Sequence, residues 1–109
     1  MSQNYRILRL TRDSSHRSNN SELWNVQPPP GALFIKGSER ALELMAKLPL
    51  RALAVVGTRV PQARSISITK QILSDLSGSD LVIISGLARG IDGAAHRAAL
   101  DAGVPTIAV

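Results

Sequence analysis

The stretch "LVIISGLARGIDGAAHRAAL", residues 81–100, runs from an apolar segment through a glycine-bounded loop into an alanine-rich segment. This pattern predicts a buried strand, a tight loop and then a helix that ends at Gly103. The small residues of the loop allow a ligand to approach the backbone closely. Arg89 and the first amide groups of the helix suit an anion, so the stretch predicts an anion-binding turn.

The same rhythm continues on both sides of this stretch. "LRALAVVG", residues 50–57, predicts an apolar strand, and "SISITKQILSDLSG", residues 65–78, predicts a helix that Gly78 terminates. "VPTIAV", residues 104–109, predicts a third strand. Strands without polar alternation are usually buried on both faces of a parallel sheet. The sequence therefore predicts an α/β class with a Rossmann-like, doubly wound parallel sheet and helices on each side.

The N-terminal part differs in character, and we expect a basic, polar arm and linker over residues 1–31 before a Rossmann-like domain over 32–109. Four apolar residues of the arm are compatible with one short strand or one helical turn: Tyr5, Ile7, Leu8 and Leu10. After "PPPG" at 28–31, a short strand is expected over 32–36. Ser38 is then a good N-cap for a helix that Pro49 ends.

Composition sets the classes of partner. Of the 109 residues, 13 are Lys or Arg and 8 are Asp or Glu, giving a net charge of +5, which favours polyanions or simply a solvated basic surface. The absence of cysteine excludes disulfides and thiolate metal sites. His16 and His96 lack metal-ligand spacing, so we expect no metal and no cofactor. No apolar run approaches the ~20 residues of a membrane helix, and the expected location is the cytoplasm.

The loop after the first core strand, "GTR", combines three useful properties. Gly57 allows close backbone approach, Thr58 offers a hydroxyl, and Arg59 offers a planar fork of donors that suits phosphate. Because ligands bind at the carboxyl ends of parallel strands, this loop lies at the edge where ligands are expected.

The loop after the second core strand, "SGLARG", reaches the same sheet edge. Ser85 offers another hydroxyl, and the amides that follow Gly86 and Gly90 can point at an anion. Taken alone, each loop is better explained as a tight turn. Two such loops on one edge favour a phosphate site, because a plain turn requires neither an arginine nor a hydroxyl.

Asp92 and His96 are four residues apart and share a helix face. One interpretation is a carboxylate that orients a general acid or base. The other is an acid at the helix start and a packed histidine, and the surrounding alanines favour it. Because no nucleophile or metal site accompanies the pair, we expect a protein that is not an enzyme. The dinucleotide pattern G-x-G-x-x-G and the phosphate loop G-x-x-x-x-G-K-[ST] are absent after the first strand.

Three segments carry a family resemblance: "LFIKG", "LAVVGTR" and "SGLARGIDGAAHRAALDAGVPTIAV". Residues 32–109 closely resemble the DNA-processing family DprA, also called Smf. The resemblance implies a Rossmann-like domain that binds single-stranded DNA and helps load the RecA recombinase during natural transformation. It also implies a basic, phosphate-holding pocket made by Gly57, Thr58, Arg59, Ser85, Gly86, Leu87, Ala88, Arg89 and Gly90. Asp92 and His96 match family positions that shape the pocket wall.

The chain departs from the family pattern in two places. Where the family commonly shows Thr, an aromatic residue and Gly, this chain has Gln62, Arg64 and Ser65. Arg64 therefore joins the candidate DNA-binding residues, and charge replaces stacking in this loop. The chain also stops at Val109, after the third core strand, where the family continues with further strands. An uncovered three-stranded sheet is expected in a fragment, in a truncated gene product, or in a protomer that covers its edge by self-association.

The leading interpretation is a non-enzymatic domain that binds single-stranded DNA in DNA processing, uptake or recombination, with an affinity that falls as salt rises. Base-stacking positions are few, because only Tyr5, Trp24 and Phe34 are aromatic. An alternative is a nucleotide-binding or nucleotide-hydrolysing protein related to phosphoribohydrolases, whose P-G-G-x-G-T-x-x-E loop is absent. A third is a nucleotide-sensing or pure interaction domain.

Overall fold

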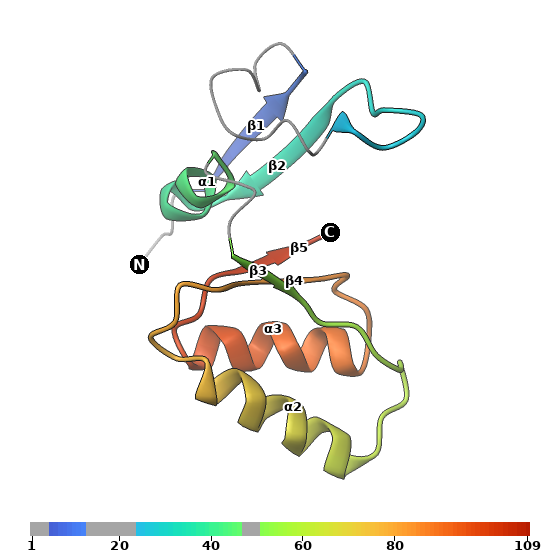
Figure 1. The fold of residues 1–109 in the computed structure, drawn as a ribbon, viewed down its shortest axis with the longest axis vertical. Helices are drawn as coiled ribbons and strands as arrows, with labels where there is room; N and C mark the ends of the chain where they lie inside the picture. Colours follow the sequence, from blue (N-terminus) through green and yellow to red (C-terminus); the bar gives the residue numbers. More distant parts are fainter. Residues whose placement is uncertain (1–4, 13–23, 47–50) are drawn as a thin grey trace. The chain divides into compact units, whose positions relative to one another are not determined.

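The computed structural model describes residues 5–12, 24–46 and 51–109, and the chain forms two units, Met1–Leu50 and Arg51–Val109 (Figure 1). A strand from the expected arm pairs with a strand on the other side of the boundary that is expected between residues 31 and 32. The basic stretch that includes His16 and Arg17, and the predicted helix stop at Pro49, lie outside the described residues.

The first unit contains a two-stranded antiparallel sheet and one helix. Strand β1, Arg6–Leu10, pairs with β2, Leu33–Gly37, and helix α1 spans Glu39–Ala46. Three of the four apolar residues near the N-terminus, Ile7, Leu8 and Leu10, thus lie in a strand and not in a helical turn, and Tyr5 directly precedes it. The hydroxyl of Ser38 accepts a hydrogen bond of 3.2 Å from the backbone N–H of Ala41, so the predicted N-cap is confirmed.

Close packing and one ion pair hold α1 against this sheet. A Cβ atom at Gly37 would lie 3.2 Å from the Cβ of Ala41, so strand and helix approach as closely as glycine allows. Leu42 is buried. Arg6 Nη1 donates to Glu39 Oε1 at 2.9 Å on the surface. This hydrogen bond, and then the negative charge of Glu39, raise the pKa of Arg6.

The second unit is a parallel three-stranded sheet with two helices. Its elements are β3 (Ala52–Ala54), α2 (Ala63–Asp75), β4 (Val82–Ser85), α3 (Ile91–Asp101) and β5 (Thr106–Ala108), with strand order β3-β4-β5. The α/β class and the parallel Rossmann-like sheet are confirmed. Both crossovers run in the same direction, and the right-handed rule then places both helices on one face. Figure 1 shows α2 and α3 on the same side of the sheet, so the expectation of helices on each side is wrong for this unit.

The core of this unit forms between the helices and the middle strand. It consists of Leu73, Ile83, Ala98, Ala99 and Val104. The alanines of α3 leave room for close approach of α2 on one side and β4 on the other. The part of the chain that the structure describes contains no helix of the length and apolar character needed to cross a membrane.

Gly103 ends α3, as predicted. Its φ of +70° lies in the left-handed region that glycine tolerates. The N–H of Gly103 donates to the Leu100 carbonyl at 3.2 Å, and that of Val104 donates to the Ala99 carbonyl at 2.8 Å. These two bonds form a Schellman motif, and Val104 enters the core directly after it.

Three expected details differ from the structure. Helix α2 begins at Ala63 instead of Ser65, so Arg64 lies in its first turn and not in the loop. The same helix ends at Asp75, and Gly78 lies in the turn that follows. The strand expected over residues 50–57 is only three residues long and is exposed, not buried on both faces. It is exposed because it lies at the edge of the sheet and α3 packs on β4 and β5 instead.

Candidate nucleic-acid interface

Strands β3 and β4 deliver two loops to the same edge of the sheet. The Val55 N–H donates to the Ile84 carbonyl at 2.9 Å, which continues the strand pairing beyond β3. The Ser85 hydroxyl donates to the Val55 carbonyl at 2.6 Å, and Ser85 is only 4% exposed. Ser85 was expected to offer its hydroxyl to a ligand. In the structure that hydroxyl holds the base of the first loop.

Glycines let the two loops interlock beyond this point. A Cβ at Gly90 would collide with the carbonyl oxygen of Thr58 and lie 2.8 Å from the carbonyl oxygen of Arg59. A Cβ at Gly57 would lie 2.6 Å from the Cβ of Ile91. The Ile91 N–H donates to the Thr58 carbonyl at 3.1 Å. The predicted juxtaposition of the loops is thus a direct backbone contact.

The start of α3 keeps several of its amide groups for the protein itself. The Ile91 N–H is bonded to Thr58, that of Gly93 donates to the Ala88 carbonyl at 3.0 Å, and that of Ala94 donates to the Gly90 carbonyl at 3.0 Å. The expected anion site on the first helical amides is therefore largely closed. No side chain caps this helix start, where Gly90 has a φ of +83°.

The unused amide groups lie in the loops instead. Within the described residues, no backbone N–H from Gly57 to Arg59 or from Gly86 to Gly90 donates a hydrogen bond. Most of these residues are exposed. Successive backbone N–H groups in a tight loop form a concave surface that attracts anions. The loops therefore offer a row of donors that water or a ligand must satisfy.

Three arginines accompany these donors. Arg59 and Arg89 lie in the two loops and Arg64 lies in the first turn of α2, and all three are exposed. None of them forms an ion pair with the residues that the structure describes. Arg64 adds a cation to a helix start that has no acidic residue and no side-chain cap. An anion near that helix start would complement both the arginine and the helix dipole.

Exposed apolar side chains surround the same loops. Val56 is 81% exposed, Val60 is 87% exposed and Leu87 is 66% exposed. The Thr58 hydroxyl accepts a hydrogen bond from the Val60 N–H at 3.1 Å, which fixes the turn that displays Val60. Leu87 has a left-handed φ of +58°, which a leucine adopts only under constraint. Sequence reasoning missed Val56 and Val60, because an apolar residue after a strand is indistinguishable from its continuation.

Asp92 and His96 lie one turn apart on α3, each 6% exposed. His96 Nδ1 lies 2.6 Å from the Thr106 hydroxyl, so β5 and not Asp92 orients the imidazole. Asp92 Oδ2 lies 3.0 Å from the position that a Cβ of Gly86 would occupy. Asp92 Oδ1 and His96 Nε2 are buried and have no partner within the described residues. Asp92 therefore lies against the loop that follows β4, whereas His96 joins α3 to β5.

The comparison with known families decides the relationship. The profile of the family described as DNA recombination-mediator protein A matches residues 10–109. The chain belongs to this family. The family is named for mediating recombination and not for a catalysed reaction, in keeping with the expectation of a non-enzymatic protein.

Members of the family from several bacteria are similar in sequence. The DNA processing protein DprA of Bacillus subtilis is 37% identical over 87 residues, which cover 80% of this chain and 28% of that protein. DprA of Streptococcus pneumoniae is 42% identical over 88 residues, covering 81% of this chain and 29% of that protein. The chain thus spans less than a third of the length of these relatives.

A solved structure agrees with the fold. The X-ray structure of DprA from Streptococcus pneumoniae matches with a TM-score of 0.73 and 33% identity, over 94% of this chain and 33% of that chain. The DprA family match therefore rests on both sequence and three-dimensional structure.

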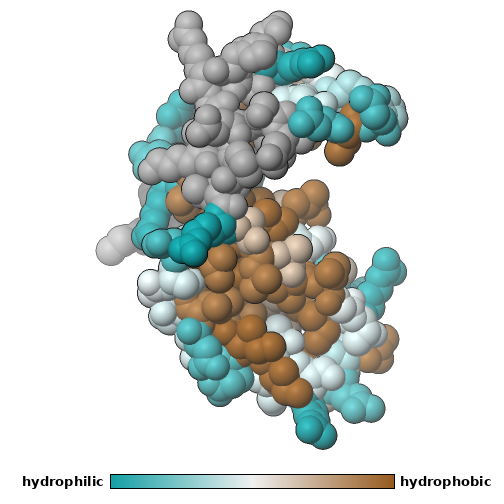
Figure 2. Space-filling model, viewed as in Figure 1, coloured by the Kyte–Doolittle hydropathy of each residue, from teal (hydrophilic) through white to brown (hydrophobic). Residues whose placement is uncertain are grey.

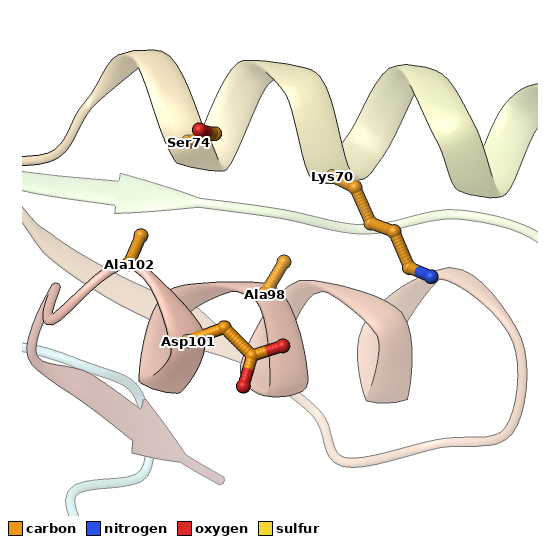
Figure 3. A pocket seen from close by; sticks show the side chains of 5 residues that line it. All are labelled: Lys70, Ser74, Ala98, Asp101 and Ala102. Atoms are coloured by element: carbon orange, nitrogen blue, oxygen red, sulfur yellow. The ribbon is translucent and has the colours of Figure 1, made fainter.

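A shallow hollow between α2 and α3 is lined by Lys70, Ser74, Ala98, Asp101 and Ala102 (Figure 3). None of these is a predicted site residue, and the two alanines make the hollow possible by their small size. No three metal-ligating side chains come together among the described residues.

Proposed function

We propose that the two interlocked loops bind the sugar–phosphate backbone of single-stranded DNA. Through this binding the chain would act in DNA processing, DNA uptake or recombination, and would help to load RecA. Membership of the recombination-mediator family supports the process, and the names of the bacterial relatives support DNA as the substrate.

One observation carries the assignment to phosphate. The backbone N–H groups from Gly57 to Arg59 and from Gly86 to Gly90, most of them on exposed residues, have no protein acceptor within the described residues. Arg59 and Arg89 project from the same two loops and form no ion pair there. Amide donors and guanidinium forks are the groups that hold phosphate oxygens in proteins. The chain's net charge of +5 favours the same ligand at long range.

The apolar rim supports a single strand over a duplex. Val56, Val60 and Leu87 are exposed beside the amide donors. In a duplex the bases are stacked inside, and the outer surface presents mainly phosphates. The three apolar side chains would therefore gain no partner. In a single strand the bases and sugars are open to apolar contact. The binding we propose therefore reads few bases and depends strongly on salt.

The experiment measures fluorescence anisotropy of a labelled oligo-dT strand titrated with the full chain. Arg59→Ala should weaken binding about tenfold or more, as expected for a lost charge-assisted hydrogen bond of ~1.5–3 kcal/mol. Arg59→Lys should recover only part of the affinity, because an ammonium group lacks the bidentate fork. Arg97→Ala is the matched control, because it removes the same charge from the exposed side of α3.

Competition separates the alternatives. Unlabelled single strands should displace the probe, whereas a duplex of equal length should displace it less well. Displacement by a nucleoside monophosphate would support a nucleotide-binding protein instead. A folded Arg59→Ala protein with the affinity of the unchanged chain would overturn the proposed site.

A further inference from the structure

The two strands of the first unit display an unusual face. In the observed register Ile7 lies opposite Lys36, and Arg9 lies opposite Phe34. Because side chains alternate along a strand, these four residues share one face of the sheet. The Lys36 ammonium lies 5.8 Å from the centre of the Tyr5 ring, which places Tyr5 at the same face. We call these five residues the β1–β2 platform.

The platform is the exposed face of this sheet. Phe34 is 72% exposed, Ile7 is 70% exposed and Tyr5 is 56% exposed. Arg9 and Lys36 are exposed as well. The residues that alternate with them are half-buried on the opposite face, which is where α1 packs: Leu8, Leu10, Leu33, Ile35 and Gly37.

The chemistry of the platform is specific. It holds two of the chain's three aromatic residues and two cations, and neither strand contains an acidic residue. Such a surface fits poorly against the apolar surface of a protein partner, because two cations would have to be buried in the contact. Flat rings beside positive charges match a ligand that has flat bases on a negatively charged backbone.

From this juxtaposition we propose that the β1–β2 platform is a second single-stranded DNA contact, at which bases stack on Phe34 and Tyr5 while Arg9 and Lys36 hold the adjoining phosphates. The proposal rests on the proposed function for the class of ligand, but it assigns the bases, which the loops of the second unit do not read. The chain has few aromatic residues for base stacking, but the fold brings two of them, which lie far apart in sequence, onto one exposed face.

The test compares Phe34→Leu with Phe34→Trp in the full chain. Leucine keeps the apolar character and removes the flat ring, and tryptophan keeps the ring. Phe34→Leu should weaken binding of an oligo-dT strand about tenfold, and Phe34→Trp should keep it, as expected for base–aromatic stacking. Because position 34 is exposed, the melting temperatures of both variants should stay close to that of the unchanged chain.

An abasic oligonucleotide of equal length isolates the role of the bases. Phe34→Leu should bind this sugar–phosphate probe as well as the unchanged chain does. Arg9→Ala should weaken both probes and lower the salt slope by ~0.7. Arg40→Ala removes an exposed cation from α1 and should change neither.

The outcomes separate this proposal from the proposed function. If Arg59→Ala weakens binding and Phe34→Leu does not, the platform is wrong and the loops remain the site. If Phe34→Leu matters and Arg59→Ala does not, the platform stands and the loop site falls. Two results would overturn the assignment, because they would show a charged surface without base stacking. One is an equal loss of affinity of Phe34→Leu for the abasic strand and for oligo-dT. The other is unchanged oligo-dT binding by Phe34→Leu together with weaker binding by Arg9→Ala.

Discussion

Gly90 lies so close to the carbonyl oxygen of Thr58 that no side chain fits between them. The contact joins the loop after β3 to the start of α3, and the hydrogen bond from Ile91 to the same carbonyl strengthens it. Each loop is therefore part of the other's structural support.

Gly90→Ala should destabilise the protein strongly. The new Cβ meets the Thr58 and Arg59 carbonyls, and alanine disfavours the φ of +83°. We expect a loss of about 3 kcal/mol or more in the free energy of unfolding, measured by urea denaturation. Gly103→Ala is the control, because its φ of +70° is also positive but open space surrounds it. It should lose roughly 1 kcal/mol. Equal losses would show that the loop contact contributes nothing.

Ser85→Ala should detach the base of the first loop from β4. The buried Ser85 hydroxyl donates to the Val55 carbonyl, and its removal leaves that acceptor without its side-chain partner. A loss of about 1–2 kcal/mol is expected. Ser77→Ala removes a similar bond, to the Ala102 carbonyl at 2.9 Å, from an exposed position, and water can replace it. Thermal melts of the two variants should therefore differ, and identical melts would contradict the structural role of Ser85.

His96→Gln should lower stability and leave DNA affinity nearly unchanged, because His96 is buried and is hydrogen-bonded to Thr106 of β5. Thr106→Val removes the hydroxyl with little change of shape and leaves a buried ring nitrogen unsatisfied, which costs about 1–3 kcal/mol. Because the two residues share one bond, the double variant should lose less than the sum of the single losses. Losses in the free energy of unfolding that add up fully would show that the two residues do not interact. A large loss of affinity in a stable His96→Gln protein would instead indicate a direct role in binding.

The 109-residue chain on its own should self-associate. The outer edges of β3 and β5 carry backbone groups that no strand pairs with in the described part of the second unit. Figure 2 shows apolar side chains gathered over the helices of this unit, where Ile68 and Ile72 are each 49% exposed and Leu100 is 70% exposed. Light scattering over a concentration series should show a rising mean mass. A constant monomer mass would contradict the prediction, and an effect of Ile72→Lys would assign the contact to the helices.

Much of the second unit could be predicted because its signals are local. Continuous apolar runs predicted the parallel strands, and Gly103 predicted the end of α3. The motif loops could be located because each follows a strand directly. The exposure of β3 could not be predicted in this way. An apolar run does not reveal whether a helix covers it, and that depends on the direction of both crossovers.

The roles within the loops were harder to predict than their location. Ser85 and Thr58 both carry hydroxyls, and only the three-dimensional structure shows that they bond to Val55 and Val60. The pairing of β1 with β2 was also beyond local reasoning, because more than twenty residues separate the two strands in sequence. For the same reason the grouping of Tyr5 with Phe34 on one face left no periodic signal.

The pairing of β1 with β2 has a consequence for how the platform is kept on the outside. A slip of one residue would turn every side chain of the slipped strand to the other face. For β1, Leu8 and Leu10 would then face water, and Arg9 would be pressed against α1. The close approach of Gly37 to Ala41 and the ion pair from Arg6 to Glu39 both oppose such a slip. Thus the interactions that keep Leu8 and Leu10 against α1 also keep the aromatic and basic side chains of the platform in solvent. Folding of the first unit is therefore enough to expose the platform.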